Sequence, residues 1–180
     1  YYRPYSWPSP EVAADVLGRA GAASDMIVGN DEEFGFMAGG IDKALKMAED
    51  LASTGDRIVI YKLGEKGAVT FAGGEEIHTG VFPVTAVKPN GAGDSFMAGL
   101  LVGIAEGRSL REAVLRGSAC AAMVVSQPGC APAMPTTAEP NTKTCRWRLV
   151  TSLPIASAAS RLSRMARIIR PQGEFSARSQ

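Results

Sequence analysis

One short segment combines the residue types that phosphate chemistry needs. Residues 88–96 (KPNGAGDSF) join a strand-like stretch to a helix through the turn Gly91-Ala92-Gly93. Small residues let the backbone approach a ligand closely, and the amides at the start of a helix favour an anion such as phosphate. Asp94 stands at that positive end, where it can accept a proton from a hydroxyl beside the phosphate. The alternative interpretation is a tight packing turn followed by an ordinary helix-start acid.

The same segment is also compatible with a second type of chemistry, that of a serine hydrolase. Gly93-Asp94-Ser95 resembles the opening motif of some serine hydrolases, in which Ser95 would be the nucleophile. Those enzymes carry their base near the C-terminal end, whereas the single histidine of this chain, His78, lies upstream and has no Asp-x-x-His companion. We therefore expect His78 to be a half-exposed strand residue. A single histidine also excludes HExxH zinc chemistry.

The elements that must position this segment follow from capping residues and hydrophobic spacing. Ser9-Pro10-Glu11 supplies an N-cap, a proline at the first helical position and an early acid, and Ser109 and Glu112 have the spacing of a capping box. Helices that alternate with short buried strands predict an α/β layered fold with some antiparallel strands. The expected helices cover residues 10–23, 41–53, 93–106 and 109–125, and the expected strands cover residues 25–29, 57–62, 68–71 and 76–79.

Charge divides the chain near residue 140. The formal net charge of the 180 residues is +1, but residues 1–140 hold 11 Lys+Arg and 17 Asp+Glu, whereas residues 141–180 hold 8 and 1. A hydrophobic content of 46% is that of a globular chain. The three cysteines form no CxxC pair, which argues against a disulfide framework or a four-ligand zinc site and favours a reduced, cytoplasmic compartment. No apolar run approaches the ~20 residues of a membrane span, so we expect no membrane partner.

The glycine turn also resembles the C-terminal signature of the ribokinase-like (PfkB) carbohydrate kinases. Residues 91–101 (GAGDSFMAGLL) carry this likeness, and three further landmarks occur in the family's order. Asn30 and Glu33 fit its Asn-x-x-Glu motif, residues 62–67 (KLGEKG) fit its nucleotide-binding turn, and residues 119–125 resemble its helix beside the adenine. The resemblance implies a ribokinase-like layered fold, of which this chain is the nucleotide-binding, C-terminal half, and ATP-dependent phosphorylation of a sugar.

The resemblance implies a catalytic role for each residue of the turn. Asp94 would be the general base that takes the proton from the sugar's terminal hydroxyl. The anion hole around the transferring phosphoryl group would be formed by the backbone amides of Gly91, Ala92 and Gly93.

The resemblance likewise implies a set of residues for ATP and Mg²⁺. Asn30 and Glu33 would arrange Mg²⁺, through its waters, near the phosphates, and Asn30 would also contact the nucleotide. Many members of the family have Asn at the position of Ser118, which would lie near the adenine. The other residues that would line the ATP site are Lys62, Gly64 and Gly67.

Within the family, residues 2–8, 26–30 and 88–89 most resemble kinases of a sugar acid formed in inositol breakdown. The expected partners are therefore this sugar acid and ATP, with a homo-oligomer left open. Two alternatives remain open as well: another sugar kinase of the family, and a remnant that binds nucleotide without catalysis.

The resemblance covers residues 1–139, which we expect to be the C-terminal half of a kinase domain whose N-terminal half supplies most sugar contacts. Residues 140–180 resemble no part of these kinases. Arg161, Arg164 and Arg167 recur every third residue, which is compatible with a basic amphipathic helix that touches membrane or nucleic acid. The composition also resembles a transit peptide. We expect an unrelated, disordered extension and no nucleic-acid partner.

Lys88 departs from the family pattern. Many relatives place Asp at this position, where it helps to hold a monovalent cation, and Lys88 would place a fixed ammonium there instead. We therefore predict that any kinase activity is unchanged when K⁺ is replaced by Na⁺ in the assay. A large activation by K⁺ would contradict this prediction.

Overall fold

The computed structural model of the chain describes residues 6–135, so the basic segment 140–180, with its expected disorder, lies outside the described residues. Short 3-10 turns cover Ile41–Lys43, Gly64–Lys66 and Ala131–Ala133. The helices and strands, in chain order, are α1 (Pro10–Ala22), β1 (Met26–Asn30), α2 (Asp31–Ala38), α3 (Ala44–Ser53), β2 (Ile58–Lys62), β3 (Ala68–Ala72), β4 (Glu75–Thr79), α4 (Ala92–Ala105) and α5 (Leu110–Val125).

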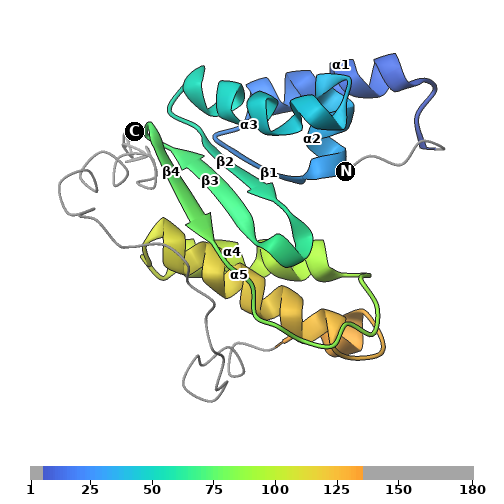
Figure 1. The fold of residues 1–180 in the computed structure, drawn as a ribbon, viewed down its shortest axis with the longest axis vertical. Helices are drawn as coiled ribbons and strands as arrows, with labels where there is room; N and C mark the ends of the chain where they lie inside the picture. The colour runs from blue at the N-terminus through green and yellow to red at the C-terminus, as the bar shows by residue number, and fades with distance from the viewer. Residues whose placement is uncertain (1–5, 136–180) are drawn as a thin grey trace, which may run out of the picture.

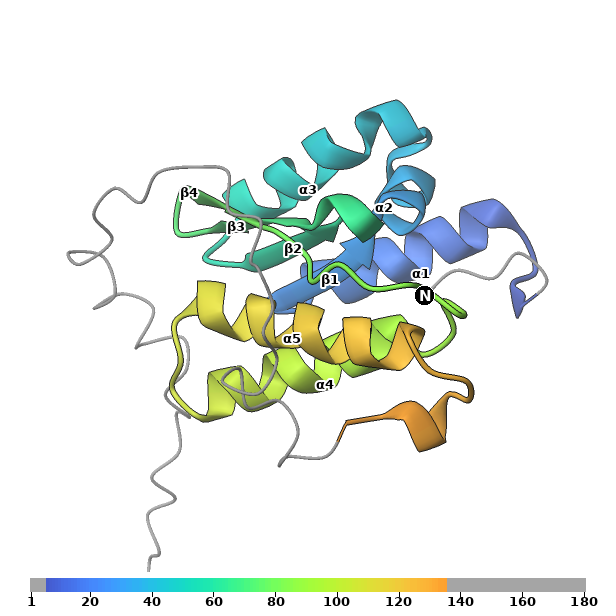
Figure 2. The ribbon, with the colours of Figure 1, turned by 60° about the horizontal axis from the view of Figure 1, so that its bottom comes forward.

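The strands form one mixed sheet in the order β1-β2-β3-β4. β1 and β2 are parallel, whereas β2 with β3 and β3 with β4 are antiparallel. Helices α1, α2 and α3 cover one face of the sheet, and α4 and α5 cover the other (Figures 1 and 2). This three-layer arrangement confirms the α/β fold with antiparallel strands that the sequence predicts.

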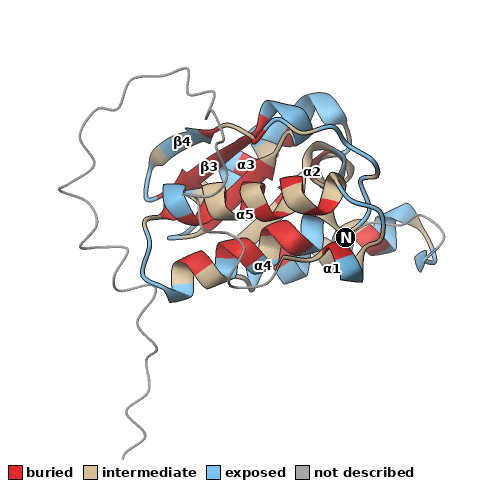
Figure 3. Cartoon of the chain, turned by 90° about the horizontal axis from the view of Figure 1, so that it is seen from below, coloured by how far each residue is buried: buried red, intermediate tan, exposed pale blue. Residues whose placement is uncertain are grey.

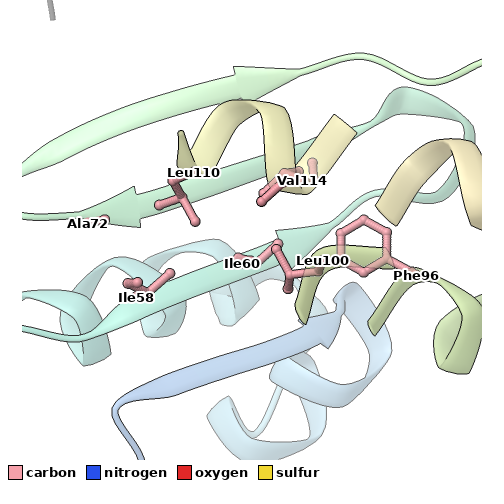
Figure 4. Packing of buried hydrophobic residues seen from close by; sticks show 9 residues of the cluster. Ile58, Ile60, Ala72, Phe96, Leu100, Leu110 and Val114 are labelled. Carbon is pink, nitrogen blue, oxygen red and sulfur yellow. The ribbon is translucent and has the colours of Figure 1, made fainter. Parts of the chain in front are cut away.

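One half of the core lies between the sheet and the pair α4 and α5. Ile58 and Ile60 of β2 meet Phe96 and Leu100 of α4, and Val114 of α5 packs beside them (Figure 4). Burial of such a side chain contributes about 1.5–3 kcal/mol, so this cluster fixes α4 against the strands. Buried and exposed positions alternate along α4 and α5 in Figure 3, as expected for helices with one covered face.

The other half of the core lies beneath α2 and α3. Val59 and Tyr61 alternate with the isoleucines of β2 and therefore point to the opposite face. There they pack with Phe34 of α2 and Ala48 of α3. The Phe34 and Tyr61 ring centroids are 5.5 Å apart, a tilted contact that ties α2 to the central strand.

Helix α2 is the element that sequence periodicity does not predict. It has eight residues, and only Phe34 and Gly35 are buried, so no hydrophobic repeat marks it. Its ends are instead defined by local chemistry: Asn30 caps the start, and Gly39 ends it with φ of 71°. Within residues 6–135, no helix is long and apolar enough to cross a membrane.

Glycines bring α4 and α5 unusually close. A Cβ placed on Gly117 of α5 would lie 2.7 Å from the Phe96 carbonyl oxygen of α4, and one on Gly103 would lie 2.8 Å from the Ala113 Cα. Each glycine therefore leaves room for the backbone of the facing helix, which a larger residue would displace. By contrast, a Cβ on Gly18 of α1 would meet nothing within 4 Å.

These glycines give opposite predictions for the same substitution. Gly18→Ala should stabilise the fold by up to about 1 kcal/mol because alanine is the better helix former. Gly117→Ala should destabilise it by about 1–3 kcal/mol, because the added methyl group forces α4 and α5 apart. Chemical denaturation followed by circular dichroism gives both free energies of unfolding. An equal or larger gain for Gly117→Ala would contradict the close packing.

Candidate active site

Two of the predicted site residues end neighbouring parallel strands. Asn30 is the last residue of β1, Lys62 is the last residue of β2, and the two are paired in the sheet register. Because the carboxyl ends of parallel strands meet at one edge, both residues and the segments that follow them lie at the same end of the sheet. Helix α2 begins directly after Asn30, and the Gly64–Lys66 turn follows Lys62.

The glycine turn delivers the start of α4 to this end of the sheet. Gly91 adopts the left-handed conformation, with φ of 86°, and no side chain caps the helix that it opens. The Ala92 N–H donates to the Pro89 carbonyl oxygen at 3.2 Å, inside the turn. The Ala92 amide of the predicted anion hole is therefore hydrogen-bonded within the turn, whereas the Gly93 and Asp94 amides belong to the first turn of α4, whose amides have no partner within the helix.

Lys62 places a positive charge over the same helix start. A Cβ placed on Gly93 would lie 3.8 Å from Lys62 Nζ, and that nitrogen is 5.8 Å from the centroid of the Phe96 ring. Within residues 6–135, Lys62 forms no ion pair with a carboxylate. An unpaired ammonium beside the positive end of a helix dipole creates a local field that favours an anion.

Asn30 and Glu33 form a reciprocal capping box at the start of α2. Asn30 Oδ1 accepts from the Glu33 N–H at 2.8 Å, and Glu33 Oε2 accepts from the Asn30 N–H at 2.8 Å. The two side chains predicted to arrange Mg²⁺ are therefore held in place by the backbone.

The donor set at this end suits Mg²⁺. No group of three or more acidic, histidine or cysteine side chains that could hold a metal occurs in the described part of the chain. Mg²⁺ needs no such group, because it retains waters and takes one or two carboxylates together with substrate phosphates. The Glu33 carboxylate and the Asn30 amide oxygen are donors of that kind.

The glycines of the predicted ATP turn lie in the short loop that connects β2 to β3. The Leu63 N–H donates to the Gly67 carbonyl oxygen at 2.8 Å, and Gly67 has φ of 97°. A Cβ on Gly67 would overlap the Thr79 carbonyl oxygen of β4, whereas one on Gly64 would meet nothing within 4 Å. Gly67 is thus required by packing, and Gly64, with φ of 58°, is open to a ligand.

Ser118 lies on α5, a different element from the other residues of this group. It is 9% exposed in the middle of α5, between Val114 and Ala121, two residues that pack against the sheet-side core. Its side chain offers little open surface to an adenine ring, so its predicted contact remains a prediction. The short serine side chain fits this buried position.

The arrangement does not support a serine hydrolase. Ser95 is 1% exposed, on the second turn of α4, where its hydroxyl is closed off from solvent. His78 lies on β4, pairs in register with Val69 and forms a 2.6 Å hydrogen bond with Glu76. The His78 side chain is 53% exposed, which confirms the expected half-exposed strand residue.

Two neighbours of the glycine turn escape sequence reasoning. Phe96 supplies the ring beneath Lys62, and Cys130 lies against Gly91. Phe96 could have been found from its place one helical turn after Ala92. Cys130 carries no such signal, because it is 39 positions from Gly91 along the chain.

Comparisons with known proteins identify relatives of this chain. Residues 1–137 match the family described as pfkB family carbohydrate kinase. The 5-dehydro-2-deoxygluconokinase of Photobacterium profundum is 39% identical over 140 residues, covering 75% of this chain and 42% of that protein. The enzyme of the same name from Geobacillus thermodenitrificans is 36% identical, covering 75% and 41%. The chain thus spans less than half the length of these relatives.

Solved structures show the same fold. Aminoimidazole riboside kinase from Salmonella enterica, complexed with its riboside and an ATP analogue, superposes with a TM-score of 0.70 at 26% identity, covering 80% of this chain and 50% of that one. Fructokinase from Vibrio cholerae, with fructose, ADP and calcium bound, has a TM-score of 0.68 at 25% identity, covering 77% and 47%. By its matched residues and its ribokinase-like fold, the chain belongs to the pfkB family of carbohydrate kinases.

Proposed function

We propose that this chain supplies the nucleotide side of an ATP-dependent kinase that phosphorylates the terminal hydroxyl of a sugar acid, 5-dehydro-2-deoxygluconate, in inositol breakdown. The observation that carries the proposal is the position of Lys62 Nζ over the first turn of α4, the turn that contains Asp94. The names of the relatives at 34–39% identity support the choice of substrate.

Phosphoryl transfer depends mainly on positioning and on charge stabilisation, and the described residues would provide both. The Gly93 and Asp94 amides and the Lys62 ammonium would stabilise the negative charge of the transferring group. One donor of this kind is worth roughly 10²–10³ in rate. The anion is held by groups that are fixed before the substrate arrives, so little reorganisation is needed during the reaction.

Asp94 would act as the general base. It is exposed in the first turn of α4, next to the amides proposed to hold the phosphate. A carboxylate at this position can take the proton of a hydroxyl that attacks the phosphate held by the neighbouring amides. The proton would leave the hydroxyl as the new oxygen–phosphorus bond forms and the bond between the γ-phosphorus of ATP and its bridging oxygen breaks, so that ADP is the leaving group.

Mg²⁺ bound to the phosphates of ATP would neutralise part of their charge when it is present. Asn30 and Glu33 would hold it through water. They lie at and just after the end of β1, next to the end of β2 that carries Lys62. Their capping box keeps both oxygens at the N-terminal end of α2, which begins at this edge of the sheet.

Phosphorylation of a different sugar is a second candidate activity, and one of the solved structures supports it. Fructokinase from Vibrio cholerae binds fructose and ADP on the same fold, so a neutral sugar remains an alternative substrate, as does 2-keto-3-deoxygluconate. A nucleotide-binding role without turnover is the remaining alternative. An assay that compares these three sugars, together with ATP binding, separates the possibilities.

Removal of the proposed base gives the sharpest test. Asp94→Asn should lower kcat by about 10²–10⁴ and leave the Kd for ATP nearly unchanged, because the amide keeps the shape but cannot take the proton. A coupled ATP-dependent kinase assay with 5-dehydro-2-deoxygluconate measures the rate, and titration calorimetry measures ATP binding. Asp15→Asn, an exposed change on α1, is the matched control. Equal rates for Asp94→Asn and the unaltered chain would reject the catalytic role, and ATP binding without any turnover would favour the binding role.

The anion-binding role of Lys62 has a separate test. Lys62→Met keeps a long apolar stem but removes the charge, so the Kd for ATP should rise by roughly tenfold or more, the equivalent of one charge-assisted hydrogen bond. The Kd for adenosine, which has no phosphate, should not change. Lys43→Met, at an exposed position before α3, is the control. Equal losses for ATP and adenosine would mean that Lys62 supports the fold rather than the phosphates.

A further inference from the structure

Three side chains from the far end of the described chain close over Gly91. A Cβ placed on Gly91 would lie 2.5 Å from Cys130 Sγ, 3.3 Å from Met134 Cε and 3.4 Å from Val124 Cγ1. The first distance is a steric overlap, and the other two are tight contacts. Only glycine fits beneath these side chains, quite apart from its left-handed backbone.

The same end of α5 also holds the strand-like stretch that precedes the turn. The Val125 carbonyl oxygen, in the last residue of α5, accepts from the Val87 N–H at 2.7 Å and from the Lys88 N–H at 3.3 Å. Residues 87–88 are thus tied to α5 just before the chain enters the glycine turn. The turn is held by hydrogen bonds on one side and by side-chain packing on the other.

From these contacts we infer that the end of α5 and the loop after it position the anion-binding amides. We name Val124, Cys130 and Met134 the Gly91 buttress. The buttress fixes Gly91 in its left-handed conformation and thereby fixes where the Gly93 and Asp94 amides point. Its residues are positioning residues, because they act through Gly91 and not on the phosphate. The inference rests on the proposed function only for its effect on ATP.

The physical reason is preorganisation. An anion hole is effective when its donors already point at the place where charge develops, and a displacement of about 1 Å can cost 10²-fold in rate. Glycine has more backbone freedom than any other residue, so a glycine turn needs an outside support to hold one conformation. The buttress is that support.

Cys130 is the buttress residue whose size can be changed most cleanly. It is half-buried and forms no disulfide, whereas Cys120 is buried against Gly99 between α4 and α5. Burial raises the pKa of the Cys120 thiol, so that group is held neutral inside the helix pair. Ala131, next to Cys130 in the loop, is exposed and provides a matched position for the same change in volume.

The test compares Cys130→Leu with Ala131→Leu. In nuclear magnetic resonance spectra without nucleotide, Cys130→Leu should shift the amide signals of Gly91, Gly93 and Asp94, and Ala131→Leu should leave them in place. With ligands, Cys130→Leu should raise the Kd for ATP by about tenfold, or 1.4 kcal/mol, and leave the Kd for adenosine unchanged. A purely structural loss would weaken both ligands alike. Cys130→Ser, which has nearly the same size, should keep the ATP affinity.

Each result has a defined meaning. Unmoved Gly91 to Asp94 amides in a folded Cys130→Leu protein would overturn the positioning role, whatever the fate of ATP binding. If Cys130→Leu does not fold, Cys130→Ala, which removes the contact without adding volume, should shift the same amides, and unmoved signals would again overturn the role. If the unaltered chain binds ATP no better than adenosine, the proposed function fails, and shifted amides would still support the buttress.

Discussion

The alternation of side chains along β2 is the constraint on which the rest of the molecule depends. Its even positions, Ile58 and Ile60, face α4, and its odd positions, Val59 and Tyr61, face α2 and α3. Because the period is two residues, Lys62 must fall on the α4 face. The strand therefore delivers its final ammonium to the start of that helix, and a register shift of one residue would send the charge to the wrong side.

The parts of this arrangement that sequence could predict are those encoded by neighbours in the chain. The Ser109 and Glu112 capping box starts α5, and apolar runs mark the strands. The parts that it could not predict depend on contacts between distant segments or on very short elements. Helix α2 has too few buried positions to show a period, and nothing near Cys130 indicates that it would meet Gly91.

Under the proposed function, Asn30 and Glu33 would satisfy two demands at once. As a capping box they complete the backbone bonds at the start of α2, which any helix in that place would need. As oxygen donors they suit Mg²⁺ near a phosphate, which the family resemblance implies. The two capping hydrogen bonds orient both side chains, and a metal site would also need them oriented. A packing explanation and a chemical one are therefore compatible here.

The close approach of Gly67 to β4 has a consequence for how this gene can change. Every other amino acid that the genetic code can place at position 67 carries a Cβ, and that atom would overlap the Thr79 carbonyl oxygen. Neutral drift at this codon is therefore confined to synonymous changes. A Cβ at Gly64, in the same loop, would meet no such steric barrier. Deep mutational scanning would record position 67 as intolerant even in variants that bind no nucleotide.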